Sequence, residues 1–281
     1  SLGIENGSFE GCVLRSLTAE NPPGKIFAQA PPRDIHLVEW KSPRPVGKPY
    51  QQANHLGIYR HNSLVGDIEF AFENVVKHNG RPYGRPSRII VDQGSSDVVC
   101  FGFRDPDGTT LELVGPDSPV DGFAGALHHC NINCSDLETS YRFYHDVIGL
   151  NSGIVCAPNL PQATSNGSLG DQLGNSAGSV YCGTQMHFRA NLMVPRNDWR
   201  NPLDILQWTL PESCGQPYQS PLNLGIVRIG FEVDDIDNAH NRLRAANCKN
   251  LSAIETWDLG SYGKRRIASL RDPDGIMLEI V

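Results

Sequence analysis

The stretch that decides the fold occurs twice in this chain. It reads RDPDGTTLELV at residues 104–114 and RDPDGIMLEIV at residues 271–281. In each copy the proline fixes φ and the glycine accepts a left-handed conformation, so we expect a tight turn. An apolar pattern around one glutamate follows the turn and predicts a strand. Each copy therefore predicts a turn that leads into the last strand of a folding unit.

Two further stretches repeat at the same separation. Residues 49–60, PYQQANHLGIYR, match residues 217–228, PYQSPLNLGIVR. Residues 35–40, IHLVEW, match residues 203–208, LDILQW. Three matches in one register indicate an internal duplication.

The boundary between the two copies falls in a Pro-, Gly- and Asp-rich stretch at residues 116–122. The sequence therefore predicts an N-terminal domain over residues 1–119 and a C-terminal domain over residues 120–281. A chain of 281 residues is long enough for two domains that each bury a core.

Each half is itself built from a smaller unit. Residues 224–233 alternate apolar and polar side chains and predict a strand. Asp234 and Asp235 then begin a predicted helix that runs to about Asn247, with acids in its first turn. Predicted strands at residues 265–270 and 276–281 complete the unit. The order is one strand, one helix and then further strands.

Equivalent units span residues 54–115 and 125–210. The first 45 residues resemble only the back half of such a unit, with strands near residues 12–18 and 35–41. We therefore expect the first unit to lack its opening strand and helix. An open strand edge is prone to pairing with another chain, so a homodimer contact is one expected way of covering it.

The composition excludes several classes of partner. The formal net charge is −7, and no Lys or Arg block offers the basic surface that nucleic acids need. No apolar run approaches the roughly 20 residues of a membrane-spanning helix. The eight cysteines form no C-x-x-C pair, so we interpret them as free thiols and expect a reducing, cytoplasmic location.

Residues 127–150, LHHCNINCSDLETSYRFYHDVIGL, together with the two RDPDG stretches, resemble the vicinal oxygen chelate superfamily of glyoxalases, extradiol dioxygenases and bleomycin-resistance proteins. The resemblance implies an α+β fold of tandem βαβββ modules. The modules form two cupped, mostly antiparallel sheets with helices outside. It also implies a divalent metal in the cup, held by residues of each module's first and last strands.

The resemblance places a first-strand ligand at His129, and alternation supports this, since His129 and Asn131 share one strand face. The C-terminal cup is then expected to offer His129, Gln207 and Glu279 to Fe, Mn, Ni or Zn. The N-terminal cup is expected to offer Glu39 and Glu112. No nucleotide cofactor is expected.

Arginine stands where two further first-strand ligands belong, at Arg60 and Arg228. Arginine stays protonated and offers only donors, so it is not an ordinary metal ligand. Two interpretations remain open. The arginines form cross-strand ion pairs with Glu112 and Glu279, or Arg228 binds an anionic group of a substrate.

Two more residues are candidates for catalysis. His187 precedes a strand of the third unit and is a candidate general acid or base, although a core or surface role is the alternative. Tyr262 lies between glycines on a loop that is placed to cover the cup, or that is an ordinary turn.

These observations predict an enzyme that acts on a small oxygenated, anionic molecule in the C-terminal cup through a divalent metal. One alternative is a metal-free isomerase, lyase or cyclase in which Arg228 stabilises an oxyanion and His129 moves protons. Another is a protein that binds and sequesters a small molecule without turnover.

Overall fold

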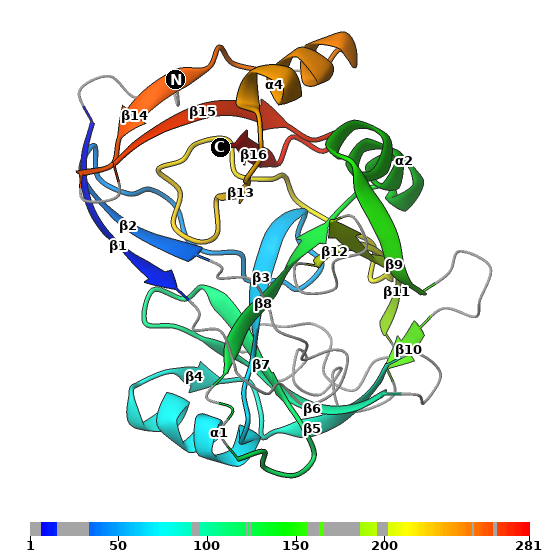
Figure 1. Cartoon of the computed structure of the whole chain (residues 1–281). Coiled ribbons are helices and arrows are strands. Elements are labelled where there is room, and N and C mark those ends of the chain that lie inside the picture. Colours follow the sequence, from blue (N-terminus) through cyan, green and yellow to red (C-terminus); the bar gives the residue numbers. More distant parts are fainter. Residues whose placement is uncertain are drawn as a thin grey trace.

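The structure is a computed structural model of the chain. It describes residues 7–15, 34–91, 96–121, 123, 125–156, 163–165, 186–195, 202–248, 250–260 and 263–281. These residues form a mixed α+β fold in which most of the structure is strand. Helices lie at opposite ends of the molecule, and two long strands cross its middle side by side (Figure 1).

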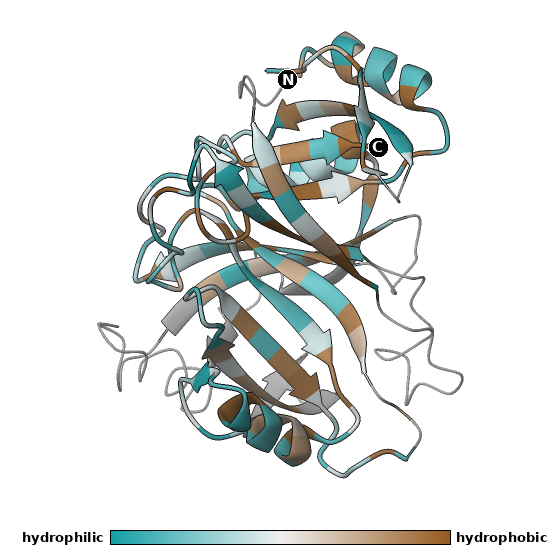
Figure 2. Ribbon diagram, turned by 90° about the vertical axis from the view of Figure 1, so that its left-hand side faces the viewer, coloured by the Kyte–Doolittle hydropathy of each residue, from teal (hydrophilic) through white to brown (hydrophobic). Residues whose placement is uncertain are grey.

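The described strands form three sheets. The first pairs β1 (Ser8–Arg15) with β2 (Asp34–Ser42). The second has ten strands: β10 (Ala163–Ser165), β11 (Met186–Pro195), β12 (Leu203–Leu210), β8 (Ala126–Asn133), β3 (Gly57–Leu64), β7 (Thr110–Gly115), β6 (Ser96–Arg104) and β4 (Arg81–Pro82) in order, with β5 (Ser87–Val91) on β6 and β9 (Leu150–Cys156) on β11. The third runs β13 (Arg228–Phe231), β16 (Met277–Ile280), β15 (Lys264–Arg271) and β14 (Glu255–Asp258). Hydrophobic and hydrophilic residues alternate along many of these strands (Figure 2).

Helices follow the opening strands of the modules, and one begins directly after Asp234 and Asp235, as the sequence predicts. They are α1 (Ile68–Lys77), α2 (Leu137–Arg142), which continues as the π-helical η2 (Phe143–Ile148), and α4 (Ile236–Ala245). An aspartate precedes each of α1, α2 and α4: Asp67, Asp136 and Asp235. Each of these carboxylates accepts a hydrogen bond from the backbone N–H three residues later, at 2.8 to 3.0 Å. These N-caps fix the start of each helix directly after an opening strand.

The duplication is visible in the strand register. In the second module β3 pairs in parallel with β7, which sets Asn62 opposite Glu112. In the fourth module β13 pairs in parallel with β16, which sets Gly230 opposite Glu279. In the third module β8 and β12 pair in the same parallel way. The first and last strands of these modules are therefore neighbours, as the βαβββ arrangement requires.

The modules combine differently from the expectation that the first and second share one cup and the third and fourth another. That expectation is wrong, because β3 and β8 pair antiparallel and join the second and third modules in one sheet. The first two strands instead approach the fourth module, where the Trp40 indole N–H donates to the Pro221 carbonyl at 3.1 Å. Each opening strand uses one edge for its own last strand, so the other edge is available to a second module.

The first module has only β1 and β2 among the described residues. In that part of the chain β2 pairs only with β1, and β13 pairs only with β16. Their repeats, β12 and β3, both pair with β8. The described part of the first module thus consists of β1 and β2, and the predicted lack of an opening strand and helix stays a prediction.

A pair of tyrosines joins the two halves at equivalent positions. The backbone N–H of Tyr50 donates to the Tyr218 hydroxyl at 3.1 Å, and the backbone N–H of Tyr218 donates to the Tyr50 hydroxyl at 2.8 Å. Their rings stack with centroids 4.0 Å apart. Burial is the main reason why the pKa of both phenols is raised. Both remain neutral donors and acceptors at neutral pH.

We expect Gly57→Ala and Gly225→Ala each to lower the free energy of unfolding by about 2–3 kcal/mol. Both glycines have left-handed φ angles, +122° and +117°. An added Cβ would lie 2.5 Å from the Tyr50 hydroxyl or 2.6 Å from the Tyr218 hydroxyl. Gly260→Ala is the control, because its φ of +63° is also left-handed but no atom lies within 4 Å of the added carbon. Equal losses in all three variants, measured by urea unfolding, would show that contact with the tyrosines is unimportant.

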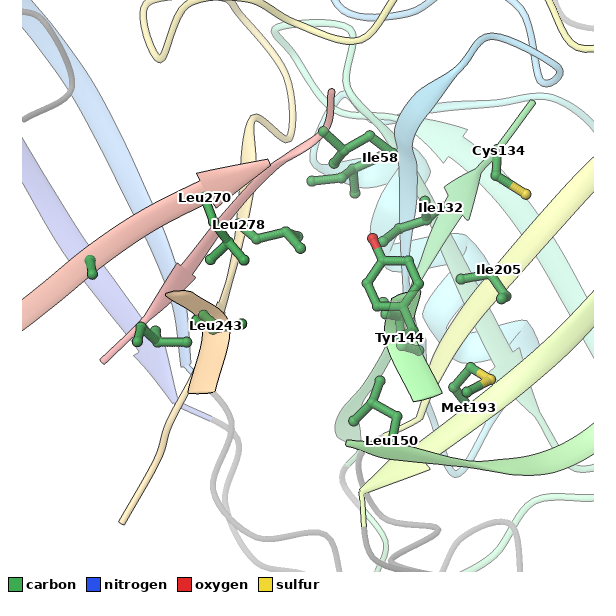
Figure 3. Packing of buried hydrophobic residues seen from close by; sticks show 14 of the residues in the cluster. Ile58, Ile132, Cys134, Tyr144, Leu150, Met193, Ile205, Leu243, Leu270 and Leu278 are labelled. Atoms are coloured by element: carbon green, nitrogen blue, oxygen red, sulfur yellow. The ribbon is translucent and has the colours of Figure 1, made fainter. Parts of the chain in front are cut away.

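The main hydrophobic core lies between the ten-stranded and four-stranded sheets. It packs Ile132 and Ile205 of the larger sheet, Tyr144 of η2, and Leu270 and Leu278 of the smaller sheet in one buried cluster. Figure 3 shows these side chains facing one another across the two sheets. The Tyr144 hydroxyl also donates to Asp272 at 2.9 Å. The third and fourth modules therefore share a core although their opening strands do not pair.

No helix in the described ranges combines the length and the apolar character that crossing a membrane requires.

Candidate functional site

Five polar side chains gather on one face of the ten-stranded sheet, and we call them the Arg60 cluster: Arg60, Asn62, Glu112, Asn131 and Asp204. They come from β3, β7, β8 and β12, which are consecutive in the sheet. The register places Asp204 beside Asn131 and Asn131 beside Arg60. The cluster thus lies at the seam where the second and third modules meet.

Hydrogen bonds connect the members of the cluster in a chain. The Arg60 Nε donates to Asn131 Oδ1 at 2.9 Å, and the Asn131 Nδ2 donates to Asp204 Oδ2 at 2.6 Å. The Asn62 Nδ2 donates to the same Asn131 oxygen. On its other side Arg60 Nη1 lies 3.4 Å from Glu112 Oε1. A single guanidinium therefore links one carboxylate directly and a second one through Asn131.

The cluster is largely removed from solvent. The side chains of Arg60 and Glu112 are 12% and 6% exposed, and Asn62 and Asn131 are buried. Burial raises the pKa of Asp204 to about 7, although Arg60 and the hydrogen bond from Asn131 act in the opposite direction. Buried carboxyls with displaced pKa values are more frequent at functional sites than elsewhere. Asp204 is thus able to exchange a proton near neutral pH.

A related group, which we call the Arg228 cluster, is made of Arg228, Glu279 and His36. The Arg228 Nε lies 3.0 Å from Glu279 Oε2. The second oxygen, Glu279 Oε1, is buried and has no hydrogen-bond partner among the described residues. The pKa of His36 is lowered, mainly by partial burial and secondly by the positive charge of Arg228. His36 occupies the repeat position of Asp204, 168 residues earlier.

The predicted ion pairs are both present. Arg60 pairs with Glu112 and Arg228 pairs with Glu279. This confirms the cross-strand interpretation of the two arginines. It leaves the anion-binding interpretation open, since a guanidinium has five N–H donors and each ion pair uses only part of them.

The predicted ligands His129, Gln207 and Glu279 come from two different sheets. His129 is opposite Asn62 in the ten-stranded sheet, and its Nδ1 contacts His128 Nδ1 at 2.6 Å. Glu279 belongs to the four-stranded sheet. Gln207 lies on the helix side of β12, where its amide contacts the Ser135 carbonyl at 3.1 Å and the Leu137 N–H at 3.3 Å.

The last-strand positions of the first and third modules are filled by His36 and Asp204, not by Glu39 and Gln207. Successive strand residues face opposite sides, and Glu39 is exposed with its carboxylate 2.8 Å from Lys41 Nζ. A signal for Asp204 was present in the sequence. The triplet Leu203-Asp-Ile205 has the same apolar, acidic, apolar pattern as Leu111-Glu-Leu113.

Two candidates lie at the edge of what the structure describes. The backbone of His187 belongs to β11 and pairs with Leu210, while its side chain is outside the described part. Tyr262 lies outside the described residues. Neither candidate is therefore placed relative to the Arg60 cluster.

A divalent cation does not fit the Arg60 cluster as it stands. The guanidinium occupies the space between Glu112 and Asn131, where carboxylate and amide oxygens converge. At an effective dielectric constant near 20, a dication about 5 Å from a fixed positive charge is repelled by roughly 7 kcal/mol. In the described ranges no three His, Cys, Asp or Glu side chains are arranged to hold a metal ion.

A hollow of about 430 Å³ lies elsewhere, between the end of α4 and the loop that follows it. Its lining includes His240, Arg244 and Cys248 but no member of either cluster. The His240 Nε2 is already 2.8 Å from the Ser252 carbonyl. This hollow is therefore a weaker candidate for a functional site than the Arg60 cluster.

Comparison with known proteins finds a family match in the C-terminal part of the chain. Residues 204–280 match the family model described as the Glyoxalase/Bleomycin resistance protein/Dioxygenase superfamily. This segment contains Asp204, Arg228 and Glu279. No curated protein sequence matches the chain.

Two solved structures share the fold. Glyoxalase I from Zea mays has a TM-score of 0.54 and 16% sequence identity, over 88% of this chain and 73% of that one. A dioxygenase candidate from Bacillus subtilis subsp. subtilis str. 168 has a TM-score of 0.51 and 13% identity, over 96% of this chain and 72% of that one. At these identities the likeness shows the fold alone.

Proposed function

We propose that this chain, whose residues 204–280 belong to the Glyoxalase/Bleomycin resistance protein/Dioxygenase superfamily, acts on a small oxygenated organic molecule at the Arg60 cluster. The reaction class that the cluster supports best is proton transfer at a carbon next to a carbonyl group. In this proposal Asp204 moves the proton and Arg60 stabilises the oxygen that becomes negative. Asn131 positions Asp204.

The main support for this proposal is the raised pKa of Asp204 together with the fixed position of its carboxyl group. Burial raises its pKa to about 7, and an acid or base is most effective when its pKa lies near the working pH. Its partner Asn131 is itself held by Arg60 and Asn62. The carboxyl group therefore has a fixed position beside a fixed positive charge.

The proposed step conserves atoms and electrons. The ionised Asp204 takes a proton from the substrate carbon, the electron pair of that C–H bond forms a C=C bond, and the π pair of the C=O bond moves to the oxygen. The resulting enolate oxygen is stabilised by N–H groups of Arg60, which gain strength in a site shielded from water. Return of the proton from Asp204 to the same carbon restores the carbonyl compound, and its transfer to the oxygen gives the enol.

The test is proton exchange into D2O, followed by ¹H NMR, with a panel of 2-oxo acids and 1,2-dicarbonyl compounds. We expect the wild-type protein to accelerate exchange for at least one compound, and Asp204→Asn to slow it about 10²- to 10⁴-fold. Glu39→Gln is the matched control, because it makes the same carboxylate-to-amide change on an exposed side chain. Equal rates for Asp204→Asn and wild type would refute the assigned role.

A binding role without turnover is the second candidate function. It is favoured by the burial of Asn62, Glu112 and Asn131, which is also the pattern of a rigid polar network that holds a sheet together. Saturable binding of a panel compound with no exchange would support this alternative. We also propose a reducing cytoplasmic location, since the six cysteines whose side chains the structure describes are free thiols.

A further inference from the structure

Arginine occurs at the same place in both halves of the duplicated chain. Arg60 is in the opening strand β3 of the second module, and Arg228 is in the opening strand β13 of the fourth. Each faces a glutamate on the neighbouring last strand, Glu112 or Glu279. The repeated pair points to one role that both clusters share.

Each guanidinium uses only some of its N–H donors for contacts within the protein. Arg60 uses Nε for Asn131 and Nη1 for Glu112. Arg228 uses Nε for Glu279. Among the described residues, Arg60 Nη2 and both terminal nitrogens of Arg228 have no protein hydrogen-bond partner. The free N–H groups are the part of an arginine that binds a carboxylate in a forked manner.

The glutamate in each pair fixes the arginine without filling all of its donors. Glu279 uses one oxygen for Arg228 and leaves the other buried without a partner among the described residues. In the Arg60 cluster the carboxylate contact of 3.4 Å is longer than the 2.9 Å bond to Asn131. Both arrangements hold a positive charge in place at the centre of a polar cluster.

We propose that in both clusters the arginine guanidinium takes the place of a divalent cation, so that each binds the anionic oxygens of a carboxylate or enolate without a metal. This inference rests on the proposed function for the Arg60 cluster and adds the charge of its ligand. It also assigns a second site of the same chemical class to the Arg228 cluster. The permanent charge of arginine makes binding independent of metal supply.

The two clusters differ in the charged group that stands beside the arginine. Asp204 supplies a second acidic group beside Arg60, whereas His36 stands at the repeat position near Arg228. The Arg228 cluster therefore carries less negative charge than the Arg60 cluster. We expect it to hold the same anion more tightly.

The first test compares pyruvate with its uncharged methyl ester, using the full-length chain purified without chelators. We expect two pyruvate sites by NMR titration or calorimetry, and at least about tenfold weaker binding of methyl pyruvate, because a charge-assisted hydrogen bond is lost. Arg228→Gln should remove the tighter site and leave the other. Equal affinity for the acid and the ester would overturn the inference.

The second test measures metal directly. Wild-type protein titrated with Co²⁺ should bind less than about one tenth of an equivalent, whereas Arg60→His should gain a site with a visible absorption band, since imidazole is a good ligand for such ions. If Arg60→His does not fold, the wild-type measurement decides by itself. Stoichiometric Co²⁺ in the wild type would overturn the inference.

The two proposals fail in different ways. If pyruvate binds but Asp204→Asn leaves exchange unchanged, the proton-transfer function is wrong and the arginine-centred sites stand. If exchange depends on Asp204 but pyruvate and methyl pyruvate bind equally, the function stands and the assigned charge of the ligand is wrong.

Discussion

Replacing Arg60 with methionine is expected to lower the free energy of unfolding by about 3–5 kcal/mol, because the change leaves buried acids without their positive partner. Glu112 is 6% exposed at its side chain and lies 3.4 Å from the guanidinium. Asp204 is linked to the same arginine through Asn131. Methionine keeps the length of the side chain but supplies no charge. Chemical denaturation at pH 7 measures the loss.

A double-mutant cycle separates the ion pair from packing. The loss caused by Arg60→Met should shrink in a Glu112→Gln background, since one buried charge is then already absent. Arg228→Met is the matched control in the other half, where the arginine side chain is 23% exposed. We expect its effect to be smaller. A loss below about 1 kcal/mol for Arg60→Met would contradict a buried, coupled network.

The second large effect is the dependence of stability on pH. Burial raises the pKa of Asp204 from 3.8 to about 7, so the folded protein keeps a proton that the unfolded chain has released. Stability should therefore fall as pH rises from about 4 to about 7 and then level off. Asp204→Asn removes this contribution of Asp204 to the pH dependence of stability. At pH 8 the variant should exceed the wild type by up to roughly 4 kcal/mol, which is the full shift expressed as free energy.

The difference between the two proteins is the quantity to measure. Burial also raises the pKa of Asp272 to about 6, so it titrates in the same window in both proteins and cancels. Asparagine at position 204 still accepts the hydrogen bond from Asn131, so packing is nearly preserved. A difference that is constant from pH 4 to pH 8, or that grows toward low pH, would contradict the raised pKa.

The sequence predicted the repeated elements because their signals are local. The Asp-Pro-Asp-Gly turns, the aspartate N-caps and the alternation of apolar residues each depend on neighbours a few residues away. The helix of the unit predicted at residues 125–210 is formed by α2 and η2, and its second half is π-helical. The repeated stretch at residues 203–208 lies within β12.

The cluster was only partly predictable. Arg60 and Glu112 were recognised as a pair because duplication repeats them in Arg228 and Glu279. Asn131 was placed on the face of His129, but its position between Arg60 and Asp204 depends on the pairing of β3 with β8. Nothing in the local sequence selects that partner over the adjacent module. The free edges of the opening strands have similar backbones. Long-range packing therefore decides which opening strand pairs with β3.

By itself the sequence determined the duplication and the modules, and it offered the two arginine–glutamate pairs as one of two interpretations, since strand alternation and turns fix which residues share a face. Only the tertiary structure decided which modules meet. It joined β3 to β8, placed Asp204 and not Gln207 beside Asn131, and so assembled one cluster from two modules. The physical reason is that side-chain direction is a local property of a strand, whereas edge pairing is decided by which packing of whole modules buries the shared core.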